Sequence, residues 1–302
     1  MRIKKPVFVL GTGRSGSTAF FNVLTRHTRV AYLTSLNERY PSKPWLNHLF
    51  MLLIDSPSVP NLLMKIIQPS EAYTFWEYNC RGFRRPCRDL RSDDATPRAK
   101  SRIVNALQTQ LTKRRDSFFT KITGWPRIAF LKQIFPDARF IHIVRDGRAV
   151  ANSLLDVDFW WGWRGPENWR LGSLPQDLDE EWKKYDRSFI ALAGIHWKIL
   201  VDAVQLCKAF LAEDEFIEIK YEDLCESPVE VYRKSLAFTG LEWTDSFEAC
   251  VRKSTFTNTN YKWRRDLTEE QQRILCEVLS PQLERLGYTN DYRFSVNKTS
   301  GI

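Results

Sequence analysis

The stretch that decides the fold is "VFVLGTGRSGST", Val7 to Thr18. Four consecutive apolar residues lead into a glycine-rich turn, and the apolar run "AFFNVL" follows the turn. The first run predicts a buried strand, Val7–Leu10, and the second predicts a helix from Ser17 to about Arg26. A strand, a glycine-rich turn and a helix in that order are typical of a loop that binds phosphate.

The rest of the chain continues this alternation of strands and helices. Further strands are predicted at Val30–Leu33, Phe118–Ile122, Arg139–Val144 and Phe216–Ile219. Helices are predicted at Ala99–Lys113, Ile128–Ile134, Gly147–Leu155, Phe189–Leu211, Val229–Thr239 and Glu269–Leu286. The pattern predicts an α/β fold whose parallel sheet is flanked by helices on both faces.

The domain organisation follows from the absence of any linker in this sequence. The 302 residues are predicted to form a single domain, 1–302, with a core of about 6–288. Two segments rich in tryptophan, proline or arginine, about 41–94 and about 156–186, break the alternation. They are predicted to be helical insertions over the edge of the sheet.

Bulk composition limits the possible classes of protein. Hydrophobic residues make up 43% and charged residues 27%, as in globular proteins. No apolar run is interpreted as a membrane span, and the apolar part of the N-terminus is too short for a signal peptide, so a cytoplasmic protein without stable membrane insertion is expected. The six cysteines form no C-x-x-C pair, which predicts reduced thiols and no zinc site. The net charge of +9 suits a polyanionic ligand, but also nucleic acid or a membrane surface.

The loop departs from the nucleotide triphosphatase pattern at one position. Gly11 is followed by four residues and Gly16, but Ser17 stands where those enzymes have lysine. Gly13 and Gly16 allow the backbone to wrap closely around an anion. Arg14 can supply a positive charge as a planar set of donors, so the sequence predicts a phosphate loop that holds something other than the end of ATP.

A second candidate anion site follows the strand Arg139–Val144. Arg145 is expected at its carboxyl end, where parallel sheets bind ligands. Ser153 comes eight residues later (153 − 145), about two helical turns away, so the two converge only if the chain bends back. Arg148 is a third candidate, and the alternative interpretation is a surface turn with a helix cap.

Together, "GTGRSGST" and "FPDARFIHIVRDGRAVANS" resemble the two cofactor signatures of the sulfotransferases, which use 3′-phosphoadenosine 5′-phosphosulfate. The resemblance implies the P-loop-like sulfotransferase fold and sulfuryl transfer to an acceptor hydroxyl, without a metal. It implies that Arg145 and Ser153 bind the 3′-phosphate. It also implies that the first loop binds the 5′-phosphosulfate through Gly13, Arg14, Ser15, Gly16, Ser17 and Thr18.

Two later segments extend the resemblance. "IKYEDLCESP" is similar to a family segment whose tyrosine, here Tyr221, lies by the adenine, and Phe256 is a further adenine neighbour. "NYKWRRDLTEEQ" loosely resembles a basic loop that closes over the 3′-phosphate, with Trp263, Arg264 and Arg265. The "RSG" triplet is closer to tyrosylprotein and bacterial sulfotransferases than to the liver enzymes with "KSG".

The resemblance also implies catalytic roles. Arg14 would contact the bridging oxygen and offset charge on the leaving phosphate. Many family members have a base histidine after a K-T pair, but "KITGWP" has none. Glu38 in "SLNERYPSKP" is therefore the candidate base, with Glu71 and Glu77 as alternatives. The four histidines, among them His142 and His196, are interpreted as structural.

The sequence leaves the acceptor and two rival functions open. Tryptophans of the second insertion could line an acceptor pocket or form a packed flap: Trp160, Trp161, Trp163 and Trp169. Carbohydrate, lipid, polyketide and peptide hydroxyls all fit, and no oligomeric state is indicated. One rival is a P-loop kinase or phosphoryl transferase, against which the missing lysine argues. The other is a non-enzymatic nucleotide or nucleic-acid binder, which would not need both signatures, so no nucleic-acid partner is expected.

Overall fold

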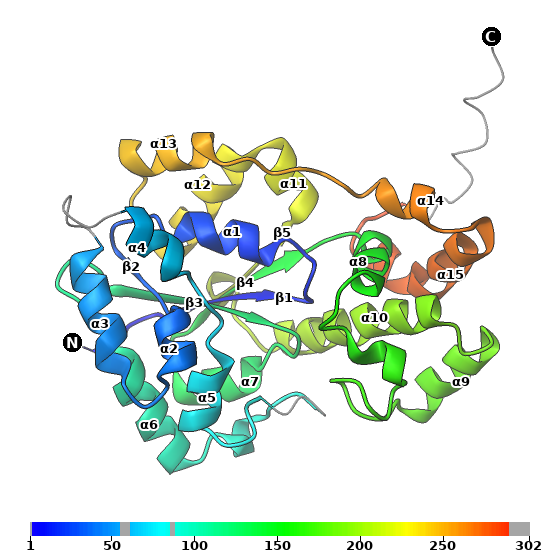
Figure 1. Cartoon of the computed structure of the whole chain (residues 1–302), viewed down its shortest axis with the longest axis horizontal. Helices are drawn as coiled ribbons and strands as arrows, with labels where there is room; N and C mark the ends of the chain where they lie inside the picture. The colour runs from blue at the N-terminus through cyan, green and yellow to red at the C-terminus, as the bar shows by residue number, and fades with distance from the viewer. Residues whose placement is uncertain (1, 55–60, 85–87, 290–302) are drawn as a thin grey trace, which may run out of the picture.

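The five predicted strands form one parallel sheet. The computed structural model describes residues 2–54, 61–84 and 88–289. Its strands are β1 (Val7–Gly11), β2 (Val30–Ala31), β3 (Ser117–Thr123), β4 (Arg139–Val144) and β5 (Phe216–Lys220). They pair in the order β2-β3-β1-β4-β5, parallel throughout (Figure 1). The predicted α/β fold with a parallel sheet is confirmed.

Seven helices match the predicted ones: α1 (Ser17–Leu24), α6 (Pro97–Gln108), α7 (Ile128–Ile134), α8 (Gly147–Leu155), α10 (Phe189–Lys208), α12 (Pro228–Thr239) and α15 (Glu269–Arg285). Four shorter helices lie in the segments predicted to be helical insertions, although their bounds were not predicted: α3 (Pro44–Leu53), α4 (Asn61–Ile66), α5 (Tyr73–Asn79) and α9 (Gln176–Lys184). Four others were not predicted: α2 (Ser35–Arg39), α11 (Tyr221–Glu226), α13 (Asp245–Lys253) and α14 (Lys262–Asp266). Each of these shorter helices has at most ten residues. Such lengths give too few turns for a clear periodic pattern.

Alternate side chains of β1 supply the cores on the two faces of the sheet. Phe8 and Leu10 belong to one cluster with residues of α5, α6 and α7, whereas Val7 and Val9 belong to another with residues of α1, α12 and α13. Figure 1 shows α5–α7 on one side of the strands and α1 with α11–α13 on the other. Burial on both faces explains why the strands read as continuous apolar runs.

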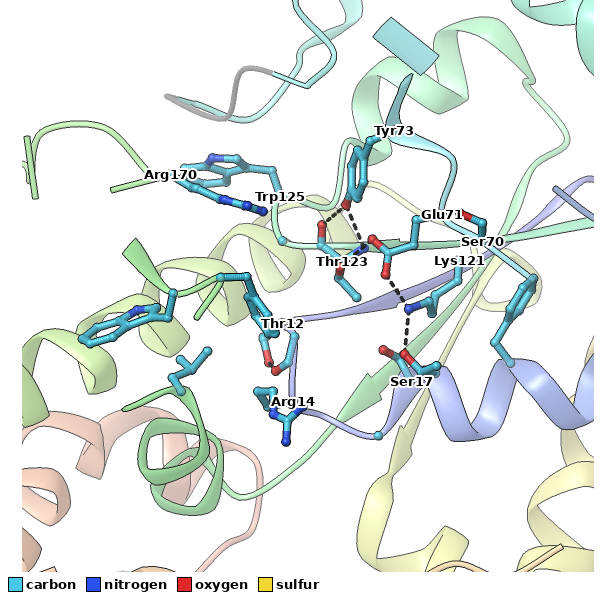
Figure 2. A pocket seen from close by; sticks show the side chains of 18 of the residues that line it. Thr12, Arg14, Ser17, Ser70, Glu71, Tyr73, Lys121, Thr123, Trp125 and Arg170 are labelled. Atoms are coloured by element: carbon cyan, nitrogen blue, oxygen red, sulfur yellow. Dashed lines mark hydrogen bonds and ion pairs between the residues drawn. The ribbon is translucent and has the colours of Figure 1, made fainter. Parts of the chain in front are cut away.

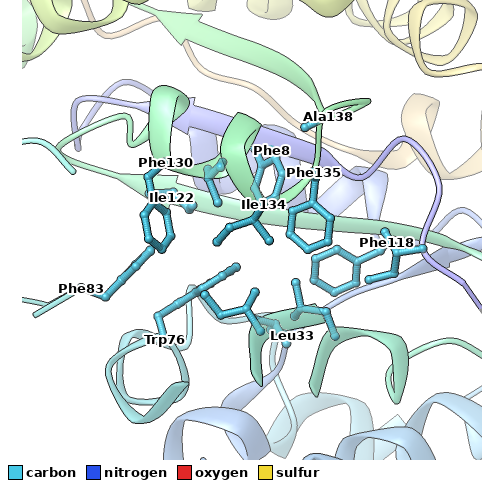
Figure 3. Packing of buried hydrophobic residues seen from close by; sticks show 14 of the residues in the cluster. Phe8, Leu33, Trp76, Phe83, Phe118, Ile122, Phe130, Ile134, Phe135 and Ala138 are labelled. Atoms are coloured by element: carbon cyan, nitrogen blue, oxygen red, sulfur yellow. The ribbon is translucent and has the colours of Figure 1, made fainter. Parts of the chain in front are cut away.

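Aromatic rings dominate the first of these cores (Figure 3). The ring of Phe8 stacks on that of Phe140 of the neighbouring strand, with centroids 5.7 Å apart. Trp76 of α5 stacks on Phe83 at 4.9 Å, and Phe83 meets Phe130 of α7 edge-on at 6.0 Å. The first insertion is therefore anchored to the sheet by its aromatic side chains.

A third cluster joins α8, α10 and α15 beyond the carboxyl ends of the strands (Figure 1). Contrary to the sequence interpretation, α10 is long and apolar enough to cross a membrane, with a mean hydropathy of 1.5 over an 18-residue stretch. In the structure 56% of that stretch is buried. The helix packs on α8 and α15, and this packing gives a physical reason for its apolar composition.

The strand order places the loop after β1 at the centre of the sheet edge. Gly11 lies opposite Thr123 of β3 on one side and Ile143 of β4 on the other. After β1 the chain builds β2 and β3 on one side, and then crosses to β4 and β5 on the other. Such a point of reversal is where open α/β sheets bind ligands.

Truncation of a central ring tests the importance of this core. Phe8→Ala should lower the free energy of unfolding by about 3–5 kcal/mol, because Phe8 is fully buried between neighbouring rings. Phe210→Ala is the matched control, because Phe210 is 88% exposed, and its effect should stay within about 0.5 kcal/mol. Urea unfolding of both variants measures the difference, and similar losses would contradict this account of the core.

Candidate functional site

The loop between β1 and α1 has an unusual backbone. Gly13, Arg14 and Gly16 all lie in the left-handed region, with φ of 78°, 57° and 84°. Glycine adopts this conformation readily, but a non-glycine residue such as Arg14 does so only under constraint. The first amides of α1 have no partner inside the helix, so they and the helix dipole favour an anion at this end.

Gly16 is also held by a neighbouring ring. A Cβ atom built on Gly16 would lie 2.1 Å from Cδ2 of Tyr221, at the start of α11. The loop therefore packs directly on the segment that was predicted to border the adenine. The hydroxyls of Ser15 and Ser17 point back toward Gly11, where a Cβ would meet them at 2.5 and 2.9 Å.

The two sequence signatures meet in space. Arg14 donates from Nε to the hydroxyl of Ser153 at 2.9 Å, and Arg145 donates from Nη1 to the carbonyl oxygen of Arg14 at 3.0 Å. The chain thus bends back after β4, as convergence required. Arg145 and Ser153, at the two ends of α8, are both linked to the loop through Arg14.

Arg145 is buried, with 8% of its surface exposed, at the junction of three segments. Its Nε donates to Oδ1 of Asn260 at 2.8 Å, and its Nη2 donates to Oγ1 of Thr259 at 2.9 Å. The guanidinium lies over the ring of Tyr221 at 4.9 Å, and the Tyr221 hydroxyl donates to the carbonyl of Thr257 at 3.0 Å. Burial raises the pKa of Tyr221 to about 12, so its hydroxyl stays protonated.

The charge of Arg145 is not neutralised by an ion pair. Among the described residues no carboxylate lies within ion-pair distance of its guanidinium, whereas the equally buried Arg148 pairs with Asp146 at 2.8 Å. Burial lowers the pKa of Arg145, although Tyr221, Glu222 and Asp146 oppose that effect, and arginine remains charged. A buried cation without a counter-ion is costly, so this position favours a bound anion.

The C-terminal candidates lie apart from this junction. Trp263 is buried in the third cluster, beneath the guanidinium of Arg148 at 4.9 Å. Arg264 lies over the same ring at 5.0 Å, and Arg265 pairs with Asp266 at 2.7 Å. A cavity of about 480 Å³ is bordered by Asp146, Arg148, Asn258, Asn260, Tyr261, Trp263, Arg264, Tyr288 and Thr289. Phe256 is half-buried against the ring of Tyr232 at 6.2 Å.

A larger cavity of about 1090 Å³ opens above the loop and extends toward the second insertion. Figure 2 shows Arg14 and Thr12 on one side of it and Glu71, Tyr73 and Lys121 facing them. Its far wall is mainly aromatic and aliphatic, formed by Trp125, Leu154, Phe159, Trp160, Trp161, Trp169 and Leu171, with the cation Arg170 among them. The cavity therefore joins a polar, cationic end to an end that is mainly apolar.

A lysine from the sheet reaches the loop. Lys121 of β3 donates from Nζ to Oγ1 of Thr18 at 2.7 Å and forms an ion pair with Glu71. Glu71 also accepts a hydrogen bond from Oγ1 of Thr123 at 2.7 Å. Lys121 was not among the predicted site residues, although it is the first residue of "KITGWP". A charged residue inside an apolar strand was the available signal.

The candidate bases differ in their contacts. The Oε2 atom of Glu38 accepts a hydrogen bond from the amide of Thr74 at 3.2 Å, close to the start of α5, and Glu38 lines the large cavity. Glu71 lines the same cavity and reaches the loop through Lys121. Glu77 accepts from the amides of Gly82 and Arg84, and it is not among the lining residues.

One histidine has a position that the sequence did not indicate. His196 of α10 lines the apolar end of the cavity, and its ring meets Trp169 edge-on at 5.7 Å. Burial, with a contribution from Arg170, lowers the pKa of His196 to about 4, so its imidazole is neutral at pH 7. Three of the four candidate tryptophans named from the sequence, Trp160, Trp161 and Trp169, line the cavity, while Trp163 packs on Phe189 outside it. His142 lies buried on β4 beside Glu218.

Comparison with known proteins gives a consistent result. Residues 6–245 match the model of the sulfotransferase family. The sequence is 24% identical to "Omega-hydroxy-beta-dihydromenaquinone-9 sulfotransferase Stf3" of Mycobacterium bovis, over 94% of this chain and 75% of that protein. Sulfotransferase STF9 from Mycobacterium avium superposes with a TM-score of 0.58 at 18% identity, over 96% of this chain and 78% of that chain. STF1 from Mycobacterium tuberculosis gives 0.51 at 16% identity, over 90% and 76%. The structural similarities show a shared fold.

The contact between Gly16 and Tyr221 can be tested by adding one methyl group. Gly16→Ala should lower the free energy of unfolding through left-handed strain of about 1–2 kcal/mol and through a clash worth about 1–3 kcal/mol more. Gly240→Ala is the matched control, because Gly240 has φ 75° but nothing within 4 Å of an added Cβ. Thermal or urea unfolding separates the two contributions. Equal losses in both variants would mean that the ring does not constrain the loop.

Proposed function

The chain belongs to the sulfotransferase family, and from this premise we propose that it transfers a sulfuryl group from 3′-phosphoadenosine 5′-phosphosulfate to an acceptor hydroxyl. The family resemblance and the fold expected from the sequence are thereby confirmed. The donor, the acceptor class and the roles of individual residues belong to the proposal. The observation that carries it is the buried guanidinium of Arg145, which forms no ion pair with a described residue. This guanidinium donates a hydrogen bond to the carbonyl oxygen of Arg14 in the glycine-rich loop.

The residues at the edge of the sheet fit the two ends of this donor. We assign the 3′-phosphate to Arg145 and Ser153, because Arg145 has no carboxylate partner among the described residues and the Ser153 hydroxyl already accepts a hydrogen bond from the guanidinium of Arg14, in the same loop whose carbonyl binds Arg145. We assign the 5′-phosphosulfate to the loop amides from Ser15 to Thr18. A Cβ on Gly13 would meet nothing within 4 Å, so the loop leaves open space beside these amides.

The remaining donor contacts follow the order of the segments along this edge. Tyr221 and Phe256 are assigned to the adenine side, since Tyr221 packs on the loop at Gly16. Arg264 and Arg265 are assigned to closure over the 3′-phosphate, with the buried ring of Trp263 as a support beneath Arg264, and closure requires Arg265 to leave its exposed pair with Asp266. That pair has a small energetic cost to break because it is solvent-exposed.

Two cations act at the reacting end. The donor supplies an activated sulfuryl group, whose departure leaves negative charge on the 5′-phosphate. Arg14 and Lys121 approach this end from the loop and from β3, respectively. Fixed positive charges aimed at a developing negative charge lower a reaction barrier because they need no reorganisation. Lys121 thereby provides the positive charge that the loop lacks at Ser17.

We propose Glu38 as the general base, with Glu71 as the competing candidate. Both line the cavity, but Glu38 has a single hydrogen-bond donor to its carboxylate among the described contacts, the amide of Thr74. Both carboxylate oxygens of Glu71 already accept hydrogen bonds, one from Lys121 and one from Thr123. Glu71 is thus better suited to position Lys121 than to accept a proton.

The acceptor proposal rests on the walls of the cavity. An apolar wall of tryptophans with a neutral His196 suits a hydroxyl carried on a largely apolar body. One relative is named for a hydroxylated menaquinone, which has that character. We therefore favour a lipid or quinone hydroxyl over a carbohydrate or peptide.

We also predict that the protein acts without a metal, binds no nucleic acid and works in a reducing, cytoplasmic compartment. The described cysteines, which exclude Cys87, are free thiols.

Nucleotide selectivity tests the donor assignment. 3′-Phosphoadenosine 5′-phosphate should raise the melting temperature of the wild-type chain, whereas ADP with Mg²⁺ and oligonucleotides should not. Arg145→Ala should weaken binding of the bisphosphate about tenfold or more, because a charge-assisted contact is lost. Arg233→Ala, which removes an exposed arginine paired with Glu248, is the control. Stabilisation by ADP–Mg²⁺ instead would indicate the rival kinase, and stabilisation by oligonucleotides would indicate the nucleic-acid binder.

Isosteric amide variants distinguish the two carboxylates. Glu38→Gln should leave affinity for the bisphosphate unchanged and reduce kcat by about 100-fold or more, because the base is lost. Glu71→Gln should weaken bisphosphate binding as well, because Lys121 loses its positioning partner. Single-turnover transfer from labelled donor, with calorimetric binding in parallel, measures both. Full activity in Glu38→Gln would move the base role to another group.

A further inference from the structure

Helix α3, "PWLNHLFMLL", contains no charged side chain although it lies on the surface. Its buried residues are Asn47, Phe50 and Met51. Its large apolar side chains that are exposed are Trp45 (53%), Leu49 (47%), Leu52 (53%) and Leu53 (52%). We call these four side chains the α3 face. A helix that is apolar on all sides is normally covered on all sides, so the α3 face is expected to meet a partner.

The exposed side chains form one stripe. The spacing of Trp45, Leu49, Leu52 and Leu53 places them within about 100° of arc on the helix, opposite the buried residues. The neighbouring helix α4 adds Ile66, which is 64% exposed. Inward-facing residues of the two segments, Phe50 and Leu63, belong to the same core cluster. The α3 face and Ile66 are therefore the outer side of two helices that pack on one core.

The segment that carries this stripe has more basic than acidic residues. Between residues 39 and 68 the sequence has three basic residues, Arg39, Lys43 and Lys65, and one acidic residue, Asp55, which lies outside the described residues. None of the three cations forms an ion pair with a described residue. All three are exposed. Their charge is thus available to an external anionic partner.

We propose that the α3 face binds the surface of an anionic lipid bilayer as a peripheral contact. Leucine side chains with a tryptophan on one face, flanked by lysines, are the features that place an amphipathic segment at the boundary between headgroups and acyl chains. Each nearby cation strengthens binding to anionic lipid. A second copy of the chain is the competing occupant, and the oligomeric state measured below distinguishes it from a bilayer.

The chain connects this surface to the large cavity. Glu38 and Pro69 both line the cavity, and the segment between them carries α3 and α4. The ends of the segment are held together by two backbone hydrogen bonds. The amide of Ser35 donates to the carbonyl oxygen of Gln68 at 2.9 Å, and the amide of Ser70 donates to that of Leu33 at 3.0 Å. Docking of α3 on a bilayer would therefore suit an acceptor drawn from lipid. That consequence rests on the proposed function, whereas the docking itself does not.

Vesicle co-sedimentation of the full chain tests the docking without donor or acceptor. The protein should bind vesicles of phosphatidylcholine with phosphatidylglycerol and bind much less to phosphatidylcholine alone, and added salt should weaken binding. Leu49→Glu/Leu53→Glu should reduce the partition coefficient about tenfold or more, because apolar contact is lost. Lys43→Gln/Lys65→Gln should reduce binding only to the anionic vesicles, by about tenfold.

Leu206→Glu/Phe210→Glu is the matched control, because these side chains are 70% and 88% exposed elsewhere on the molecule, and it should bind as the wild type does. Unchanged melting temperatures and unchanged binding of 3′-phosphoadenosine 5′-phosphate would verify that the variants remain folded. Absence of vesicle binding, or an equal loss in the control variant, would overturn the proposal. So would a dimer in sedimentation equilibrium that Leu49→Glu/Leu53→Glu dissociates, because the α3 face would then serve a second copy.

Discussion

The hydrogen bond from the Arg145 guanidinium to the carbonyl oxygen of Arg14 is the contact on which the site depends. It requires β4 to lie next to β1, which the register of Gly11 with Ile143 provides. It also fixes the carbonyl of a residue whose left-handed backbone leaves little freedom. Because the same guanidinium holds Asn260 and Thr259, one buried charge organises the loop, the end of β4 and the segment before α14.

The energetics of that charge explain the arrangement around it. Desolvating an arginine is unfavourable unless nearby groups satisfy its donors and its charge. Neutral oxygens satisfy the donors of Arg145, but the carboxylate of Asp146 is committed to Arg148. Among the described residues, Arg145 thus has no carboxylate partner, whereas Arg148 forms an ion pair. Under the proposed function, this contrast separates Arg145, whose charge is left for a ligand, from Arg148, whose charge is paired with Asp146.

Much of the fold and part of the site could be predicted from the sequence. The strands were predictable because burial on both faces makes them continuously apolar, and α10 because its pattern is long. Short helices such as α2 and α14 were not, since so few turns carry no periodic signal. Motif spacing predicted Arg14, Arg145 and Ser153, and the structure brings these three residues together. Lys121 and His196 were not predicted, because their positions at the large cavity arise from the packing of distant segments. Trp263 carries a family-like motif, but packing places its ring in the core.

Lys121 has a consequence for how the site tolerates motion. A lysine on the glycine-rich loop would take its position from the loop backbone. Here the ammonium is carried by a central strand and braced by Glu71. The position of this charge is therefore determined by the sheet, whereas that of Arg14 is determined by the loop. A local displacement of the loop would thus move one cation of the cavity without carrying the other away.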